Sequence, residues 1–390
     1  MCTIYSRSTI AVAFALVAGL WLISCTPVAT RPAATTEPAA EAPAHRADSA
    51  RWEQVKRAAR EEGKVVVAGP GFPGLRAALV ENFQQAYGIQ VEYLGLPSGE
   101  VITRVDREFR ADRPSIDVNI GGFTGCWTMG ERGQIEDVST QLLDPAILDP
   151  AAWRRGALKF VEASPQMPQD FHCALQTAEW VMTDLFVNTT VVKPEDIRSW
   201  KDLLKPEYRG KIASFDPRIA GPAQTTVPYL SRLFGLDYLR DLYVGQQVVL
   251  TGDNRQLAEW VARGTYPIGI ALVQAAVEPL RAEGLPLQRV FPGDGPGALT
   301  SGFGTIMKIK NSPNPNTAAV FINWFASKEA QEIWEREMLE LSLRKDTTSG
   351  VPEYIIPRPG IQYSVDATTP EQFFAYGAQA RERLQQLLGR

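Results

Sequence analysis

The strongest constraint on the fold of this chain is an alternation of short apolar runs with amphipathic segments. Strands are expected at Lys64–Ala68, Ile89–Tyr93 and Ile116–Ile120. Segments of helical period separate them at Leu75–Tyr87 and Ser98–Arg110. Strands that alternate with helices through short loops form a parallel sheet with helices on its faces. The pattern therefore predicts an α/β fold.

A second block of strands and helices follows, and 390 residues are enough for two lobes. In this block we expect strands at Glu179–Val187, Gly210–Ser214, Ile268–Leu272 and Ser301–Ile309. Helices are expected at Thr225–Phe234, Gln256–Arg263, Asn316–Ser327, Lys328–Glu337 and Pro370–Leu388, besides one at Ala50–Glu62 that precedes the first strand.

Composition excludes several classes of protein. The chain is 45% hydrophobic with a formal net charge of −4, so it is not a disordered protein. Its 40 Lys and Arg against 44 Asp and Glu leave no positive field, so we expect no nucleic-acid partner. It has two His and neither a G-x-S-x-G nor an H-E-x-x-H motif. We expect no enzyme, no cofactor and no metal; an exported hydrolase that uses only carboxylates stays open.

Residues 1–24 are predicted to be a signal peptide. The charged Arg7 precedes the apolar run Ile10–Ile23, which is shorter than the ~20 residues of a spanning helix. The run ends in Leu22-Ile23-Ser24-Cys25, which resembles a bacterial lipobox, so we expect Cys25 to carry a lipid. An uncleaved anchor and an ordinary signal peptide are the alternatives.

The predicted lipid would hold an exported protein at the outer face of the bacterial cytoplasmic membrane or in the periplasm. Residues 25–48 are rich in Pro, Ala, Thr and Glu and are expected to be a disordered tether. Beyond them the chain has two cysteines, Cys126 and Cys173. We expect a disulfide between them in an oxidising compartment. Two buried free thiols, or a metal site with His172, are the alternatives.

The order of short motifs resembles the iron-type family of extracellular solute-binding proteins, the capture subunits of ABC importers. The resemblance spans residues 52–350 and rests on Trp52-Glu53, Ser98-Gly99-Glu100, Asp117–Gly122, Trp200–Leu204, Asp216-Pro217-Arg218, Ser301–Met307 and Ser342-Leu343-Arg344.

The resemblance implies a two-lobe, periplasmic-binding-protein-like fold of type II, with an interlobe cleft and two crossover segments. We expect lobe 1 to comprise residues 49–173 and 311–390, the crossovers to be residues 174–188 and 299–310, and lobe 2 to be residues 189–298. The implied function is to close on a small solute and pass it to ABC permease subunits. A receptor that signals to a sensor partner stays open.

Candidate ligand-binding residues lie where strands run into helices, because helix N-termini carry unsatisfied N–H donors and the positive end of the helix dipole. The candidates are Phe72, Ser98, Gly99, Thr124, Trp180, Arg218, Gly221 and Gln274. Ser98 and Thr124 have helix capping as their alternative role. The alternative for Arg218 is an ion pair with Asp216, and Trp180, like Trp127, is otherwise a packing residue.

Iron-binding members of the family use a pair of adjacent Tyr after a late strand of the second lobe. Here Ala275-Ala276 align with that pair, and no two adjacent Tyr occur anywhere in the chain. We therefore expect a phosphonate, a sugar phosphate, a polyamine or another polar solute. Ferric iron is the alternative within the same fold.

Overall fold

The computed structural model describes residues 43–182, 185–295, 297–348, 350–361, 363 and 373–389. The predicted signal peptide and Cys25 lie outside these residues. The first described helix, α1 (Pro43–Glu62), begins before the expected end of the tether, so the prediction of disorder is wrong for residues 43–48. Pro43 is its first residue, a position at which proline's fixed φ suits a helix. None of the described helices is both long and apolar enough to cross a membrane.

The first sheet has six strands in the order β2-β1-β3-β13-β5-β4. They are β1 (Lys64–Gly69), β2 (Gln90–Gly95), β3 (Val118–Gly121), β4 (Lys159–Phe160), β5 (Leu175–Gln176) and β13 (Thr305–Lys308). Strand β1 pairs in parallel with β2 and with β3, and each of these three strands leads into a helix. These helices are α2 (Pro73–Tyr87), α3 (Ser98–Arg110) and α4 (Phe123–Glu131). The predicted alternation is therefore confirmed.

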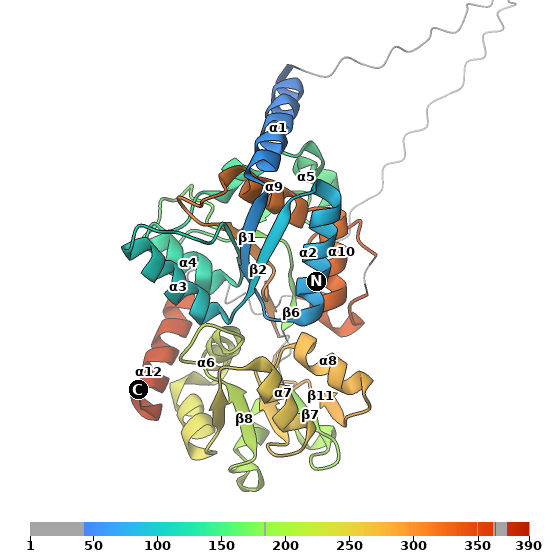
Figure 1. Cartoon of the computed structure of the whole chain (residues 1–390). Coiled ribbons are helices and arrows are strands. Elements are labelled where there is room, and N and C mark those ends of the chain that lie inside the picture. The colour runs from blue at the N-terminus through green and yellow to red at the C-terminus, as the bar shows by residue number, and fades with distance from the viewer. Residues whose placement is uncertain are drawn as a thin grey trace, which may run out of the picture. The chain divides into compact units, whose positions relative to one another are not determined.

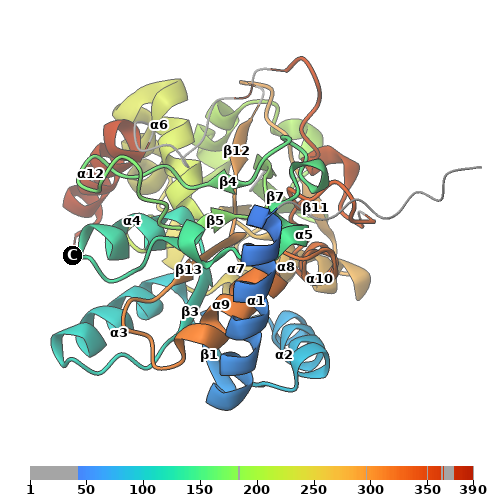
Figure 2. The ribbon, with the colours of Figure 1, turned by 90° about the horizontal axis from the view of Figure 1, so that it is seen from above.

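Helices pack on both sides of this first sheet (Figure 2). Helix α1 lies against α9 (Pro315–Phe325), and α2 lies against α10 (Lys328–Met338). A short helix, α5 (Pro145–Leu148), also contacts α1. Cys126 of α4 and Cys173 form a disulfide with their Cα atoms 5.5 Å apart. Both cysteines are buried in the core between α4 and the sheet.

The second sheet has five strands in the order β11-β7-β10-β8-β9. They are β7 (Leu185–Asn188), β8 (Ile212–Phe215), β9 (Val249–Thr251), β10 (Ile268–Ile270) and β11 (Leu287–Arg289). Strand β8 is parallel to its neighbours β9 and β10. The helices that follow these three strands are α6 (Ala223–Arg240), α7 (Asn254–Ala262) and α8 (Gln274–Ala282).

Two further strands, β6 (Trp180–Met182) and β12 (Ala298–Thr300), pair with each other and with neither large sheet. The chain passes from β5 to β7 through β6 and returns from β11 to β13 through β12. This is the two-sheet α/β fold with two connections that the sequence predicts. The single strand expected at Glu179–Val187 is, however, two strands, β6 and β7. A continuous apolar run does not show where a chain leaves one sheet for another.

The C-terminal helix differs from the expected division into lobes. Helix α12 (Gln379–Leu388) packs against α6, and its Ala380 and Leu384 are buried in the core of the second sheet (Figure 1). We expected residues 311–390 to belong with the first sheet, and for α12 this is wrong. A helical period shows which face of a helix is apolar but not which partner covers it. The remaining lobe boundaries stay predictions.

Candidate functional site

A cavity of about 560 Å³, its open mouth included, is lined by residues from both large sheets' helices and from the β6–β12 pair. The N-terminal turns of α3 and α4 contribute Ser98 and Thr124, and the turns at the start of α6 and α8 contribute Gly221 and Val273. Each of these helices follows the carboxyl end of a strand. Ligands of open α/β sheets bind at such ends.

The four helices that begin at this cavity share an unusual property, because none has a side chain that caps its N-terminus. Their N-cap residues are Pro97, Gly122, Pro222 and Val273, which cannot accept a hydrogen bond through a side chain. The first N–H groups of a helix have no partner within the helix. Some first-turn N–H groups, such as those of Glu100 and Gln224, bond to preceding carbonyls. The helix ends line the cavity without a side-chain cap and bring the positive ends of their dipoles to it.

Helix α7 is the internal comparison. It also follows a strand of the second sheet, but its N-terminus is not among the lining residues. Asp253 caps it by accepting hydrogen bonds from the backbone N–H groups of Arg255 and Gln256, at 2.8 and 3.1 Å. Capping is thus present at this N-terminus, which does not line the cavity, and absent at the four that do.

The turn into α8 is held in a strained conformation. Ala271, between β10 and Val273, has φ 58°, in the left-handed region that non-glycine residues rarely adopt. Such a conformation costs on the order of 1 kcal/mol and persists where the surrounding structure holds it. Ala271 is fully buried and lies two residues before Val273, which lines the cavity.

One wall of the cavity is a row of three side chains on neighbouring extended segments. Trp180 of β6 lies opposite Thr300 of β12. On the other side of Trp180 runs the segment after α10. An antiparallel bridge between Ala178 and Ser342 sets the register of this segment, so that Glu340 lies opposite Trp180. Side chains opposite one another project from the same face. All three line the cavity, as does Met182 two residues along β6.

Glu340 is the charged member of the lining among the described residues, and it is 4% exposed. Its Oε1 accepts a hydrogen bond from the backbone N–H of Phe303 and its Oε2 one from Trp334 Nε1, both at 3.1 Å. Gly302 makes room for it, because a Cβ at that position would overlap the carboxylate. Sequence reasoning missed Glu340: a Glu at the end of a polar helix gives no signal of burial.

Two buried polar side chains have atoms without a hydrogen-bond partner among the described residues; Trp180 lines the cavity, and Gln274 follows the lining residue Val273. One is Trp180, whose Nε1 is buried in a side chain that is 5% exposed. The other is Gln274, the first residue of α8, whose amide O and N are both unpaired although the residue is 3% exposed. Buried polar groups are normally paired, so these atoms point to a missing partner.

The structure places four of the predicted residues on the cavity: Ser98, Thr124, Trp180 and Gly221. Ser98 and Thr124 are inside their helices and are not the caps. Gly99 and Gln274 adjoin lining residues. Phe72 precedes α2, lines a separate groove beside β2, and its ring lies 6.5 Å from that of Phe303.

Arg218 is not among the lining residues. Its guanidinium pairs with Asp216, and its Nη1 donates to the carbonyl of Gly389 at 2.9 Å. Hydrogen bonding to Asp216 raises the pKa of Arg218. Trp127 is in the core, where its Nε1 donates to the carbonyl of Glu162. The structure thus gives both residues the structural role that was the alternative to ligand contact.

Nothing in the described part of the chain resembles a metal centre made of three or more His, Cys, Asp or Glu side chains. Ala275, which aligns with the first Tyr of the iron-binding pair, is 8% exposed and packs with core residues of the first sheet. The cavity therefore offers N–H groups, hydroxyls, an indole and one carboxylate.

Comparison with protein families gives one match: the family described as bacterial extracellular solute-binding protein matches residues 69–332. An uncharacterized protein of Haemophilus influenzae (strain Rd) is 25% identical over 306 residues, which cover 76% of this chain and 82% of that protein.

Solved structures of periplasmic binding proteins share the fold. The protein AfuA of Actinobacillus pleuropneumoniae, with fructose-6-phosphate bound, is 20% identical over 83% of this chain and 98% of its own, with a TM-score of 0.64. Iron-bound HitA of Pseudomonas aeruginosa is 17% identical over 83% of this chain and 99% of its own, with a TM-score of 0.61. The substrate-binding protein of an ABC transporter from Agrobacterium tumefaciens is 16% identical over 83% of this chain and 95% of its own, with a TM-score of 0.65.

Proposed function

Because the chain belongs to the family of bacterial extracellular solute-binding proteins, we propose that it captures a small organic anion in the cavity described above. Delivery to the permease subunits of an ABC importer is the second part of this proposal. The main support for solute capture is that four helix N-termini without side-chain caps converge on one cavity. A member of this family binds its solute and does not transform it.

The chemistry of the lining favours an anion over a cation. Each helix N-terminus behaves as roughly half a positive charge, and its N–H groups point along the helix axis towards a ligand. Ser98 and Thr124 add hydroxyl donors. No Lys or Arg lines the cavity within the described part of the chain, so backbone dipoles would have to supply the attraction. The fructose-6-phosphate bound to AfuA supports a ligand with a phosphate group.

Capture would proceed by closure. Helices α3 and α4 follow strands of the first sheet, and α6 and α8 follow strands of the second. A ligand that accepts hydrogen bonds from both pairs stabilises one arrangement of the two lobes over others. The β6 and β12 strands connect the sheets and are the proposed hinge.

We also propose that Cys25 carries the lipid and that the polar residues after it tether the receptor to the membrane. A mature N-terminus at a diacylglyceryl-modified Cys25, read by mass spectrometry, is the expected result. The Cys25→Ala variant should leave the membrane fraction. If that variant stays membrane-bound, the lipid anchor is wrong and the solute proposal is unaffected.

Iron and polyamines fit this cavity less well. A ferric ion needs hard anionic donors such as phenolates, whereas Ala275 and Ala276 occupy the aligned positions. A polyamine would face the positive ends of four helices with one lining carboxylate, Glu340, to receive it. A phosphate or phosphonate ester matches the donors better.

A ligand screen tests the proposal. The purified protein is heated with fructose 6-phosphate, 2-aminoethylphosphonate, ferric citrate or spermidine, and the hits are titrated by calorimetry. A ligand at 100 times its Kd stabilises the folded state by about 2.7 kcal/mol, which a melting curve resolves. We expect a phosphate or phosphonate ester to stabilise the protein. Stabilisation by ferric ion or spermidine alone would overturn the proposal.

A further inference from the structure

We propose that the face of the β6–β12 pair opposite the solute cavity carries a second ligand site, which takes an aromatic carboxylate. The site is a pocket of about 930 Å³, its open mouth included, which lies within the size range of small-molecule sites. Among the described residues, it shares only Met182 with the lining of the solute cavity. The proposal is therefore independent of solute capture.

The alternation of side chains along β6 separates the two sites. Trp180 and its partner Thr300 line the solute cavity, whereas Val181, the next residue, lines the second pocket. Successive side chains of a strand project to opposite faces, so the pocket lies on the other face of the strand pair. The short 3-10 helix η7 (Glu353–Ile355) contacts β6 and contributes Tyr354 to this pocket.

Aromatic side chains of the described residues line this pocket: Trp200, Tyr229, Phe291, Tyr354 and Tyr363. The rings of Phe291 and Tyr354 lie 5.5 Å apart at an interplanar angle of 67°, and the guanidinium of Arg289 lies 5.4 and 4.8 Å from them. These contacts hold the two rings in place. Phe291 is nevertheless 50% exposed, so part of its ring is open to a ligand. A flat aromatic ligand suits such a wall, because aromatic rings attract one another in offset or edge-to-face contact.

Arg358 is the charged member of the lining within the described part of the chain. Its backbone N–H donates to the hydroxyl of Tyr363 at 2.8 Å, so the turn that carries Arg358 is tied to the wall of the pocket. Its guanidinium pairs with no carboxylate of the described residues. A guanidinium offers a planar fork of N–H donors that matches a carboxylate. One positive charge beside aromatic rings therefore fits an aromatic monoanion.

The hydroxyl of Tyr354 is the second polar feature of the pocket. Its oxygen is buried and has no hydrogen-bond partner among the described residues. Buried polar groups are normally paired, so this oxygen points to a missing partner. A ring N–H or a phenolic hydroxyl of the ligand would donate to it. The ligand class is therefore an aromatic carboxylate whose ring carries a polar group.

Calorimetric titration of the unmodified protein with indole-3-acetate tests the site. This probe has an aromatic ring, a ring N–H and a carboxylate, and indole-3-acetamide is the matched probe without the charge. We expect saturable binding of indole-3-acetate, roughly tenfold tighter than binding of the amide, as a hydrogen bond to a charged group provides. Equal affinities for the two probes, or no saturable binding of indole-3-acetate, would overturn the proposal.

Two variants locate the bound probe. Arg358→Gln should weaken binding of indole-3-acetate roughly tenfold, and Phe291→Ala should weaken it about three- to tenfold through the lost ring contact. Both side chains are exposed, so we expect both variants to fold. Arg209→Gln, at an exposed position before β8, is the matched control and should keep the affinity of the unmodified protein.

Ser98→Pro distinguishes the two sites, because Ser98 lines the solute cavity and not the second pocket. We expect this variant to bind indole-3-acetate as the unmodified protein does. If Ser98→Pro weakens binding of the probe while Arg358→Gln and Phe291→Ala do not, indole-3-acetate occupies the solute cavity. That result would overturn the second site and leave anion capture intact.

Discussion

Arg218 and Asp216 form a two-point ion pair across a single turn, with Nε 3.0 Å from Oδ1 and Nη2 2.8 Å from Oδ2. The backbone N–H of Arg218 also donates to Asp216 Oδ1, at 2.9 Å. The guanidinium that the sequence offered as an anion clamp is thus held in the loop between β8 and α6. In the proposed function, the donors for an anion are therefore the backbone N–H groups and hydroxyls that line the cavity.

The first prediction concerns Arg218→Ala. Because Arg218 does not line the cavity, we expect the affinity for a phosphate or phosphonate ester to change less than about twofold. The ion pair is partly exposed, so its loss should lower the free energy of unfolding by about 0.5–1 kcal/mol. Calorimetric titration and urea denaturation measure the two effects. A tenfold loss of affinity without a larger loss of stability would restore Arg218 as a ligand contact.

The second prediction separates the hydroxyl of Ser98 from its backbone N–H. Ser98→Ala removes the hydroxyl, and Ser98→Pro removes the N–H as well. Proline is tolerated at the first position of a helix, and Pro97, with ψ 141°, has the extended conformation that a following proline requires. We expect about a fivefold loss of affinity for Ala and a further loss of about tenfold for Pro.

The free energy of unfolding of each Ser98 variant should lie within about 1 kcal/mol of that of the unmodified protein, because neither change removes a core side chain or a helix cap. Titration of both variants with the same ester gives the comparison. Equal affinities for Ala and Pro would show that the backbone donor at the start of α3 takes no part in binding.

The third prediction concerns the disulfide of Cys126 and Cys173. The sequence separation is 47 residues, for which the loop-entropy argument gives roughly 4 kcal/mol of stabilisation. The double variant Cys126→Ala, Cys173→Ala should lose most of this free energy of unfolding in urea denaturation. The same loss should follow reduction of the unmodified protein. An unchanged denaturation midpoint under reducing conditions would contradict a stabilising bond.

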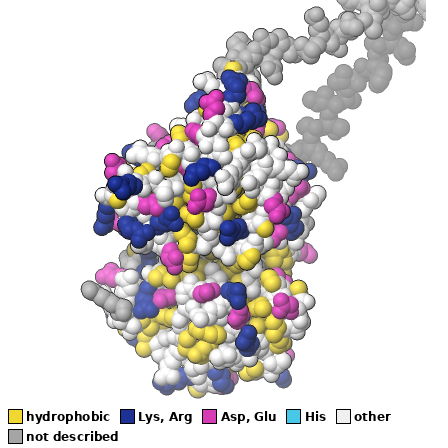
Figure 3. All heavy atoms as spheres, viewed as in Figure 1, with side chains coloured by type: hydrophobic (Ala, Val, Ile, Leu, Met, Phe, Trp, Pro, Cys, Tyr) yellow, Lys and Arg dark blue, Asp and Glu magenta, His cyan; other side chains and the backbone are white. Residues whose placement is uncertain are grey.

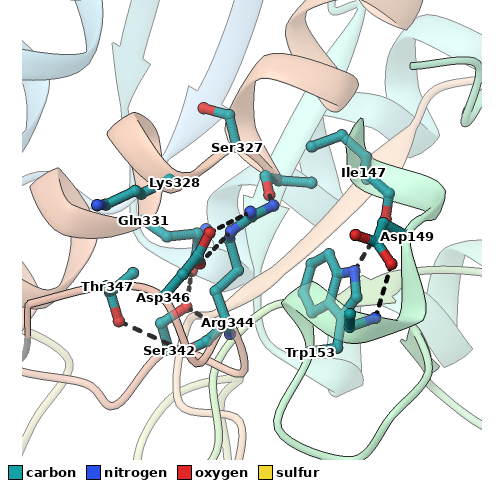
Figure 4. Close-up of polar contacts among 12 residues, drawn as sticks. Ile147, Asp149, Trp153, Ser327, Lys328, Gln331, Ser342, Arg344, Asp346 and Thr347 are labelled. Carbon is teal, nitrogen blue, oxygen red and sulfur yellow. Dashed lines mark hydrogen bonds and ion pairs between the residues drawn. The ribbon is translucent and has the colours of Figure 1, made fainter. Parts of the chain in front are cut away.

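The fourth prediction concerns Arg344, which ties the segment after α10 to the rest of the first sheet's helices (Figure 4). Its Nε and Nη2 donate to Asp346 at 2.8 and 2.7 Å, its Nη1 donates to the carbonyl of Ala326, and its guanidinium lies 5.6 Å from the ring of Trp153. Lysine cannot reproduce this planar set of contacts.

For Arg344→Lys we therefore expect a loss of about 1–3 kcal/mol in the free energy of unfolding. The exposed neighbour supplies the control, and Lys345→Met should stay within about 0.5 kcal/mol of the unmodified protein. Equal stabilities of the two variants would show that the Arg344 contacts contribute nothing measurable.

The fifth prediction is a pH dependence that arises at Glu179, next to Trp180 in the wall of the cavity. Burial acts to raise the pKa of Glu179, but Lys159 and Arg155 outweigh it and hold this pKa below its usual value. A carboxyl with a lowered folded-state pKa adds stability above its unfolded pKa of about 4.3, and this is lost as the pH falls through the folded value.

Glu179→Gln should therefore be less stable than the unmodified protein at pH 7 by about 2 kcal/mol, and the difference should shrink below about pH 4. Denaturation at a series of pH values gives the curve. If the difference in the free energy of unfolding is the same at pH 7 and at pH 3, the charge of Glu179 does not contribute to stability.

On the face of the molecule shown in Figure 3, Lys and Arg side chains lie among Asp and Glu side chains. This agrees with the near balance of 40 basic and 44 acidic residues in the sequence. Such a surface gives no electrostatic reason to expect a polyanionic partner.

Local patterns predicted the βα units well, because hydrophobic periodicity and the Gly and Pro residues that end helices and strands depend only on neighbouring residues. The helix at Ser98–Arg110 has the predicted bounds, and Lys64–Ala68 is a strand within one residue. Ser98, Thr124 and Gly221 were found by the same logic, since they stand at the junction between a strand and a helix.

Features that depend on distant partners were missed. The register between residues 178 and 342 creates the place for Glu340, and nothing near Glu340 in the sequence indicates it. Likewise α12 is amphipathic, but only the tertiary structure shows that α6 covers its apolar face. The strained φ of Ala271 also has no local signal, since a left-handed residue before a helix usually suggests glycine.

The most direct test of anion capture by uncapped helices is the amide NMR spectrum of the protein during titration with fructose 6-phosphate or 2-aminoethylphosphonate. We expect saturable shifts that are largest at the first-turn amides of α3, α4, α6 and α8, with the Asp253-capped amides of Arg255 and Gln256 in α7 unchanged. Saturable binding that leaves all four of those N-termini unshifted would contradict anion capture by these helices.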